Sequence, residues 1–258
     1  MMRLLGSGAL PGGLRLLGLA GSLGLLMPAG CAAPAAPPPS GMSSPSSSGV
    51  PSSGAAPAVT RVLRVMPLGD SITMGAGSVD GSGYRALLYR RLTAAGIRVD
   101  FVGSQHTGAG PDADHEGHSG WTLTQLARHL DAWLDTARPD VVLLHAGTND
   151  LRTPAAAALA PQVLTRVLAT IARDRPAAEV YVAEIIGNQD IGDGRTRQRR
   201  ADAYNEQVPA IVAAAGAHFH LVDQSAVRGP ADLSDKLHPN DAGYRQMAAT
   251  WFHALQQL

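Results

Sequence analysis

From residue 62 onward, short apolar runs alternate with longer amphipathic stretches, and this alternation limits the possible fold more than any other feature of the sequence. The short runs have strand length, and the stretches between them carry apolar residues at helical spacing. Strands are predicted at 62–68, 97–102, 141–145, 179–186 and 218–222, and helices at 84–95, 123–137, 154–175, 197–215 and 241–257. Such strands pair in parallel through right-handed crossovers. We therefore expect an α/β fold, a three-layer α/β/α sandwich with a five-stranded parallel sheet.

The first 59 residues have a different composition. Residues 1–31 combine Arg3 and Arg15 with a short apolar run at 16–27 and small residues after it, which predicts an export signal. Residues 32–59 contain Pro-Pro-Pro, Ser-Ser-Ser and no charged residue, a composition typical of a disordered linker. The rest of the chain, 60–258, has the size of one α/β domain.

Cys31 is the only cysteine of the chain, so an intramolecular disulfide is excluded. Its position directly after the apolar run and Ala29-Gly30 resembles the lipobox of bacterial lipoproteins, although Pro28 stands where that motif usually has an aliphatic residue. Two interpretations remain open, a lipid anchor at Cys31 or cleavage nearby without modification. Both predict a domain outside the cytoplasm, either secreted or lipid-anchored at the cell surface.

The charge of the domain argues against a nucleic-acid partner. Two of the 21 basic residues, Arg3 and Arg15, precede residue 60, whereas all 21 acidic residues follow it. The domain therefore carries a small net negative charge, unlike the basic surfaces that bind nucleic acids. We expect a monomer that needs no cofactor.

Polar residues follow the first and third predicted strands, at the sheet edge where α/β proteins place their sites. Ser71 comes after the first strand in Gly69-Asp70-Ser71, where backbone N–H groups can face a developing oxyanion. Asn149 comes after the third strand in Gly147-Thr148-Asn149-Asp150, and its amide can donate to the same oxyanion. Each motif alone is also an ordinary turn or helix cap.

Asp235 and His238 follow the fifth predicted strand and its loop. Residues three apart in a helical turn face the same side, so the Asp235 carboxylate can hold Nδ1–H of His238 and direct Nε2 outward. The alternative is a helix start, with Asn240 or Asp241 as its cap and His238 merely exposed. Together, a nucleophile, a base, an orienting acid and an oxyanion donor at the ends of different strands indicate nucleophilic catalysis by serine.

These sequence blocks resemble, in the expected order, those of the GDSL esterases and lipases, also called SGNH hydrolases. The resemblance covers essentially the whole domain, and it implies the flavodoxin-like SGNH hydrolase fold. By the same resemblance, Ser71 is the nucleophile, and Asp235 and His238 complete a catalytic triad.

A further block, His118-Ser119-Gly120-Trp121-Thr122, is similar to the second block of this family. The resemblance implies an oxyanion hole formed by the backbone N–H groups of Ser71 and Gly120 and by the side-chain amide of Asn149. The longer run from His115 to Thr122 is similar to the second block of family 3 carbohydrate esterases, a branch that includes acetylxylan esterases.

The prediction is a secreted serine esterase that hydrolyses short acyl esters, in particular acetyl esters on a small-molecule or polysaccharide carbohydrate, through an acyl-enzyme. Three alternatives stay open: a lysophospholipase or lipase with the same triad, an acyltransferase, and a noncatalytic carbohydrate-binding surface module. The last predicts loss of Ser71 or His238, and both are present. The sequence shows no long apolar lid, which favours short acyl groups.

Several other residues are assigned structural roles. Histidines and carboxylates gather between residues 106 and 118, but without the His-Glu-x-x-His spacing, so no metal is predicted, and a structural calcium ion stays open. Trp121 is expected to pack into the core with partial exposure. His218 and His220 are expected to face away from the core, and the arginines within 195–200 to solvate a helix start.

Overall fold

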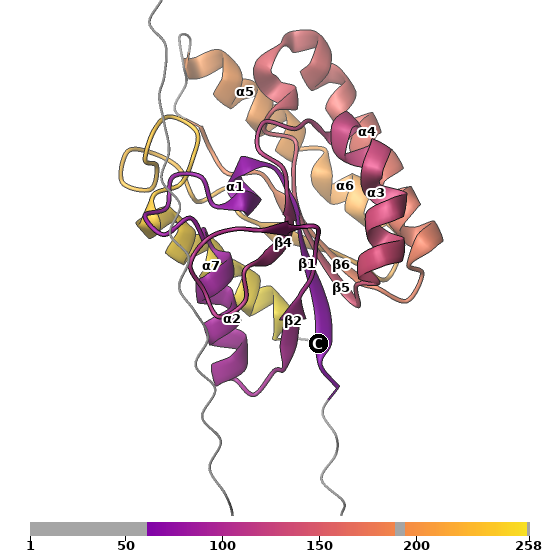
Figure 1. The fold of residues 1–258 in the computed structure, drawn as a ribbon. Helices are drawn as coiled ribbons and strands as arrows, with labels where there is room; N and C mark the ends of the chain where they lie inside the picture. The colour runs from indigo at the N-terminus through magenta and orange to yellow at the C-terminus, as the bar shows by residue number, and fades with distance from the viewer. Residues whose placement is uncertain (1–60, 189–193, 257–258) are drawn as a thin grey trace, which may run out of the picture. The chain divides into compact units, whose positions relative to one another are not determined.

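The structure is a computed structural model, and it describes residues 61–188 and 194–256. The predicted export signal, Cys31 and the linker lie outside the described residues. Within them, strands and helices alternate along the chain, as expected for an α/β fold (Figure 1).

The strands form one sheet, ordered β3-β4-β1-β5-β6-β7, with β2 also paired to β1. All pairs are parallel except β3 with β4, which are antiparallel. The strands are β1 (Leu63–Gly69), β2 (Val99–Phe101), β3 (Gln105–His106), β4 (Asp114–Gly117), β5 (Val141–His145), β6 (Glu179–Glu184) and β7 (Phe219–Asp223).

The expectation of five strands is wrong, because the described part of the chain forms a sheet of seven. Strands β2 and β4 share one position beside β1: β2 pairs with Leu63–Val65, and β4 pairs with Leu68 and Gly69. The pairing on this side skips Pro67, which has no N–H to donate to a ladder. The segment that contains β3 and β4 is rich in charged residues and histidine, which is why it reads as a loop in the sequence. With β2 and β4 counted as one position, the order is that of a flavodoxin-like sheet.

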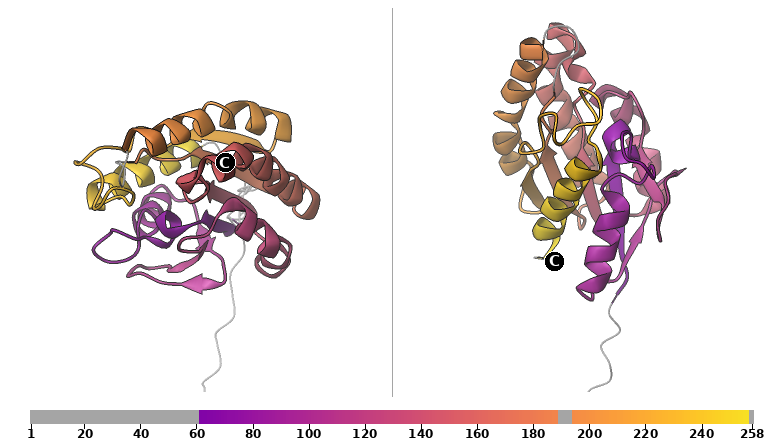
Figure 2. Two further views of the ribbon diagram at one scale, coloured as in Figure 1. Left: turned by 90° about the horizontal axis from the view of Figure 1, so that it is seen from above. Right: turned by 90° about the vertical axis from the view of Figure 1, so that its left-hand side faces the viewer.

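Helices cover both faces of the sheet (Figures 1 and 2). Helices α2 and α7 pack on one face, and α3, α4, α5 and α6 lie over the other. The helices are α1 (Ser71–Met74), α2 (Arg85–Ala94), α3 (Leu123–Ala137), α4 (Pro154–Asp174), α5 (Gly194–Asn205), α6 (Val208–Ala215) and α7 (Asp241–Leu255), and a 3₁₀ turn, η1, spans Asp150–Arg152. All five residues of β5 are buried, as is usual for a parallel strand covered on both faces.

The predicted helix at 197–215 is two helices. Helix α5 ends at Asn205, and α6 begins at Val208 with Pro209 in its first turn. Proline is favoured there and breaks a helix interior, because it lacks the N–H that would bond to the preceding turn. The other predicted helices are present with ends that differ by a few residues.

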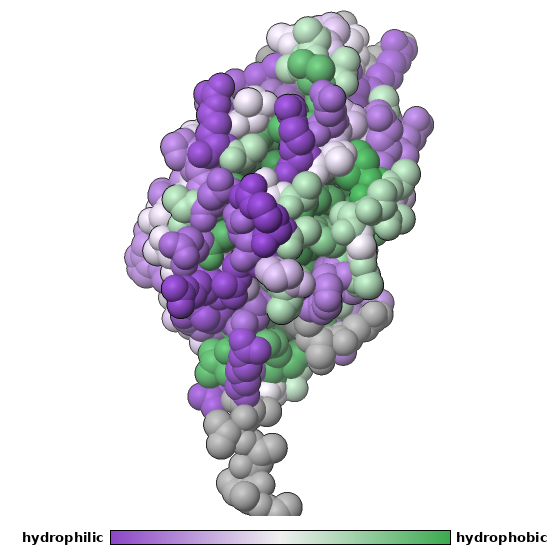
Figure 3. Space-filling model, turned by 90° about the vertical axis from the view of Figure 1, so that its right-hand side faces the viewer, coloured by the Kyte–Doolittle hydropathy of each residue, from purple (hydrophilic) through white to green (hydrophobic). Residues whose placement is uncertain are grey.

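Helix α4 is apolar enough by length and composition to cross a membrane, but one side of it belongs to the core. Val163, Leu164, Val167 and Leu168 are buried against the sheet and neighbouring helices. The other side leaves apolar side chains at the surface, among them Leu159. Figure 3 shows green areas among polar ones on the side of the molecule where α3 and α4 lie in Figure 1. Helix α4 is therefore a helix of the packed domain.

Candidate active site

Ser71 begins the short helix α1, two residues after the carboxyl end of β1. The Asp70 side chain caps this helix by accepting the N–H of Ile72 at 3.0 Å. The helix ends at Gly75, whose φ of 106° lies in the left-handed region that glycine adopts without strain. This strand-to-helix turn holds Ser71 at the sheet edge where the sequence predicts it.

A chain of hydrogen bonds joins Ser71, His238 and Asp235. Ser71 Oγ lies 2.9 Å from His238 Nε2, and His238 Nδ1 lies 2.8 Å from Asp235 Oδ2. Ser71 precedes Asp235 by 164 residues and His238 by 167 residues in the sequence, so only the fold brings them together. In this geometry the imidazole can accept the Ser71 proton while the carboxylate stabilises the imidazolium.

Asp235 and His238 lie in a turn and not in a helix. The backbone N–H groups of Leu237 and His238 donate to Asp235 Oδ1 at 2.7 and 2.8 Å. Partial burial by itself raises the pKa of Asp235, but the hydrogen bonds from His238 and Leu237 outweigh it and lower that pKa. The helical prediction for this pair is therefore wrong, although the two side chains do meet, and Asn240 caps α7 separately.

The loop that carries His238 is fixed to α1 by close contacts. Ser234 N–H donates to the His238 carbonyl at 2.9 Å, which closes the turn around the imidazole. Tyr244, on α7, donates its hydroxyl to the carbonyl of Ile72 within α1 and to that of Ala76, which follows α1. These contacts join α7, which begins just after His238, to the helix that carries Ser71.

Strand β4 brings Gly120 to the same edge. Gly117 is paired with Gly69, and a Cβ on Gly117 would lie 2.6 Å from the backbone nitrogen of Met74, so only glycine allows this approach. The turn then reaches Gly120, which has a φ of 79° and open space around the position of a Cβ. Glycine suits Gly120 because of its backbone conformation.

Asn149 lies after β5, beside the turn that contains Gly120. Its Nδ2 donates to the carbonyl of Trp121 at 2.9 Å, and its Oδ1 accepts from Arg152 at 2.9 Å. These two bonds fix the orientation of the amide. The other contact of Nδ2, with Asp70 Oδ2, is 3.5 Å long, so the second N–H makes no strong hydrogen bond. Within residues 61–188 and 194–256, the N–H groups of Ser71 and Gly120 donate to no protein acceptor.

Two buried carboxyl groups, for which the sequence predicts no role, support these donors. Burial raises the pKa of Asp70 to about 6 and that of Asp150 to about 6. Asp150 accepts the N–H of Leu123 at 3.0 Å and so holds the start of α3, directly after the Gly120 turn. In the sequence Gly-Thr-Asn-Asp, the last carboxylate is expected at the surface of a turn, so only the fold shows this contact.

His118 lies between two tryptophans beside the Gly120 turn. Its ring stacks on Trp121 at 4.4 Å and on Trp133 at 4.6 Å, and its Nε2 lies 2.6 Å from a Glu116 carboxylate oxygen. Trp121 packs against the core and is partly exposed, as predicted. The stack and the bond from Asn149 to the Trp121 carbonyl both contact the Gly120 turn at Trp121.

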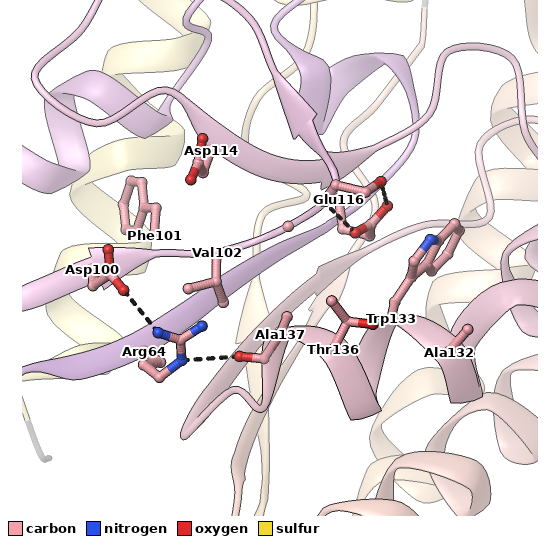
Figure 4. A pocket seen from close by; sticks show the side chains of 12 residues that line it. Arg64, Asp100, Phe101, Val102, Asp114, Glu116, Ala132, Trp133, Thr136 and Ala137 are labelled. Atoms are coloured by element: carbon pink, nitrogen blue, oxygen red, sulfur yellow. Dashed lines mark hydrogen bonds and ion pairs between the residues drawn. The ribbon is translucent and has the colours of Figure 1, made fainter.

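A pocket of about 440 Å³ lies beside Trp133, one of the two tryptophans of this stack (Figure 4). Glu116 and Trp133 border it together with Arg64, Asp100 and Val102. Neither Ser71 nor His238 lines it, so it is separate from the hydrogen-bonded chain.

The histidines and carboxylates at 106–118 are engaged with one another and with hydroxyl groups. His106 contacts Asp114, and His115 lies 2.7 Å from the Thr107 hydroxyl; burial lowers the pKa of His115 to about 3. No group of three or more potential metal ligands occurs in the described part of the chain.

Two further groups of residues have partners that the sequence does not indicate. His218 and His220 both bond to Glu179 and are partly exposed. Arg197 donates to the Thr148 carbonyl and Arg200 to that of Arg152, so these arginines hold the segment around Asn149 as well as facing solvent.

Comparison with known proteins identifies a family and several relatives. Residues 68–246 match the model of the GDSL-like lipase/acylhydrolase family. A family 3 carbohydrate esterase from Clostridium thermocellum is 37% identical, with a TM-score of 0.65 over 75% of this chain and 94% of that one. A carbohydrate esterase of family 3 from Talaromyces cellulolyticus is 28% identical, with a TM-score of 0.64 over 76% and 97%.

A multidomain esterase from Ruminococcus flavefaciens is 27% identical over 221 residues. The alignment includes 75% of this chain but spans only 28% of the length of that relative.

Proposed function

The chain belongs to the GDSL-like lipase/acylhydrolase family, and from this membership we propose that it is an extracytoplasmic serine esterase that removes acetyl groups from carbohydrate. The observation that carries the proposal is the continuous chain of hydrogen bonds from Ser71 Oγ through His238 to Asp235. The names of its relatives, among them two family 3 carbohydrate esterases, support the choice of carbohydrate.

In the proposed reaction His238 Nε2 takes the proton of Ser71 as Oγ attacks the ester carbonyl carbon. Asp235 holds Nδ1–H and stabilises the positive charge on the ring, while its own lowered pKa keeps it ionised. The tetrahedral intermediate collapses when His238 returns the proton to the leaving sugar oxygen. Water, activated by the same imidazole, then attacks the acetyl-Ser71 ester and releases acetate.

Three donors are assigned to the oxyanion. They are the backbone N–H groups of Ser71 and Gly120 and the second N–H of Asn149. Their positions are set by backbone geometry and by the bonds of Asn149 to Trp121 and Arg152, so they need little rearrangement when charge develops. Preorganised donors of this kind contribute about 3 kcal/mol each to transition-state stabilisation.

The substrate assignment is tested by acyl-length and acceptor preference. We expect the full chain to hydrolyse p-nitrophenyl acetate faster than the butyrate and octanoate, and to release acetate from acetylated xylan. A preference for octanoate would instead identify a lipase. Acetyl transfer to an added sugar hydroxyl in place of water would identify an acyltransferase.

A further inference from the structure

Asn188 is a buried asparagine that is 6% exposed. Among the residues that the structure describes, 61–188 and 194–256, neither its Nδ2 nor its Oδ1 has a hydrogen-bond partner. A buried polar atom without a partner costs about 1 to 3 kcal/mol of stability, so folded proteins rarely contain one without a reason. An amide that lacks both bonds in the free protein is suited to a ligand that supplies a donor and an acceptor.

Asn188 lies at the same sheet edge as Ser71. It follows β6 by four residues, and β6 is separated from β1 only by β5. Two strand spacings amount to about 10 Å, roughly the length of a disaccharide that would reach from the nucleophile along this edge. In open α/β sheets this edge is where ligands bind.

The backbone on either side of Asn188 is firmly held. Gly187 N–H donates to the Val227 carbonyl at 3.0 Å, at the start of the loop that leads to His238. The Asn188 N–H donates to the Gln198 side chain on α5 at 2.8 Å. A Cβ on Gly187 would lie 2.6 Å from Arg228 Cβ, so the backbone and this loop are in direct contact. The unpartnered amide therefore belongs to a fixed position between α5 and the His238 loop.

We infer that Asn188 binds hydroxyl groups of the sugar that carries the acetyl ester, and so selects for carbohydrate over simple alkyl or lipid esters. This inference rests on the proposed function. An acetyl methyl or a fatty acyl chain has no polar atom for a buried amide, whereas vicinal sugar hydroxyls offer both a donor and an acceptor. Substrate binding thus supplies hydrogen-bond partners to the Asn188 amide, which is unpaired in the free protein.

The test compares Asn188→Leu with Asn205→Leu as a matched control. The Asn205 amide is fully used, because it pairs with both the N–H and the carbonyl of Ile185 at 3.0 and 2.9 Å. Both substitutions remove an amide of the same size near the end of β6. Only Asn188→Leu removes an amide that has no partner in the free protein.

The readout is the ratio of kcat/KM for acetylated xylo-oligosaccharide to kcat/KM for p-nitrophenyl acetate. We expect Asn188→Leu to lower this ratio on the order of 10- to 100-fold and to keep or raise the Tm, because an unpaired polar group is replaced by an apolar one. Asn205→Leu should lower the Tm and leave the ratio near that of the wild type.

The outcomes separate the inference from the function on which it rests. A wild-type ratio in Asn188→Leu, or a loss of Tm like that of Asn205→Leu, overturns the role of Asn188 while the esterase remains. If the wild type hydrolyses p-nitrophenyl acetate but no acetylated sugar, both the carbohydrate substrate and the role of Asn188 are overturned. Binding supplies a second measurement: in the Ser71→Ala background, Asn188→Leu should raise the Kd for acetylated xylo-oligosaccharide.

Discussion

Asn149 donates its side-chain amide to the carbonyl oxygen of Trp121 over 2.9 Å. This bond joins the segment after β5 to the turn after β4, two segments that meet only because both strands flank β1. It also determines which N–H of the amide remains for an oxyanion. The proposed oxyanion hole is therefore a property of the sheet order as much as of the individual residues.

Asn149→Ala is expected to lower kcat for p-nitrophenyl acetate by about 10²- to 10³-fold, because a donor that acts on the oxyanion is removed. KM should change little, since the ground-state carbonyl uses this donor weakly. Steady-state kinetics check this result. A rise in KM at constant kcat would show that Asn149 binds substrate without stabilising the transition state.

Asp235→Asn is expected to lower kcat by roughly two to four orders of magnitude, because the neutral amide cannot stabilise the imidazolium of His238. The Asn side chain can still accept the backbone N–H groups of Leu237 and His238, so the turn should persist. The variant should therefore have a far-ultraviolet circular dichroism spectrum like that of the wild type. Nearly full activity would refute the orienting role of Asp235.

Gly117→Ala tests the close approach of β4 to α1. The added methyl group would meet the backbone of Met74 and Asp70, which cannot move without displacing Ser71. Overpacking of this kind costs about 1 to 3 kcal/mol, so both the unfolding free energy and the activity should fall. Ala at Gly120 meets no atoms, and its effect should come from the positive φ alone. Urea unfolding of the two variants distinguishes these causes, and an unchanged Gly117→Ala protein would contradict the packing argument.

The sequence predicts the parts of this site that are local, and misses those that depend on the sheet order. Ser71 and Asn149 follow apolar strands, so their place at the sheet edge can be predicted from periodicity. Asp235 and His238 do meet, but through a turn in which Asp235 accepts backbone N–H groups, a geometry that spacing alone does not distinguish from a helix.

Strands β3 and β4 escape prediction because their residues are polar and because β4 pairs with β1, a strand far from it in the sequence. The fully buried Glu116 gives no local sign of burial, since its partners come from the fold: Ser104 donates to it through both its N–H and its hydroxyl. The same holds for Asn188, whose burial and lack of partners are visible only in three dimensions.

His145 is expected to make the protein less stable in acid. It is buried at the end of β5, which lowers its pKa from 6.5 to about 4, and its Nε2 accepts the N–H of Ile186. Between pH 6.5 and pH 4, His145 is protonated in the unfolded chain and neutral in the folded protein. The contribution of neutral His145 to the free energy of unfolding is therefore fully present above pH 6.5 and is lost as the pH falls toward 4.

His145→Gln keeps an acceptor for Ile186 and cannot be protonated. Relative to the wild type, it should lose less unfolding free energy between pH 7 and pH 4.5, with a difference of up to about 3 kcal/mol. Asp70 and Asp150 act in the opposite direction, since their raised pKa values favour the folded state at low pH, but they are common to both proteins. The unfolding free energy of both proteins is measured by urea denaturation at each pH. The same pH dependence in both would show that His145 does not cause the loss of stability in acid.

Activation of Ser71 by His238 is tested by hydrolysis of p-nitrophenyl acetate by the wild type and Ser71→Ala, with mass spectrometry of the wild type quenched during turnover. We predict a loss of at least about 10³-fold in kcat for Ser71→Ala, and a mass increase of one acetyl group in the wild type that this variant lacks. Equal turnover by a folded Ser71→Ala protein would show that Ser71 is not the nucleophile.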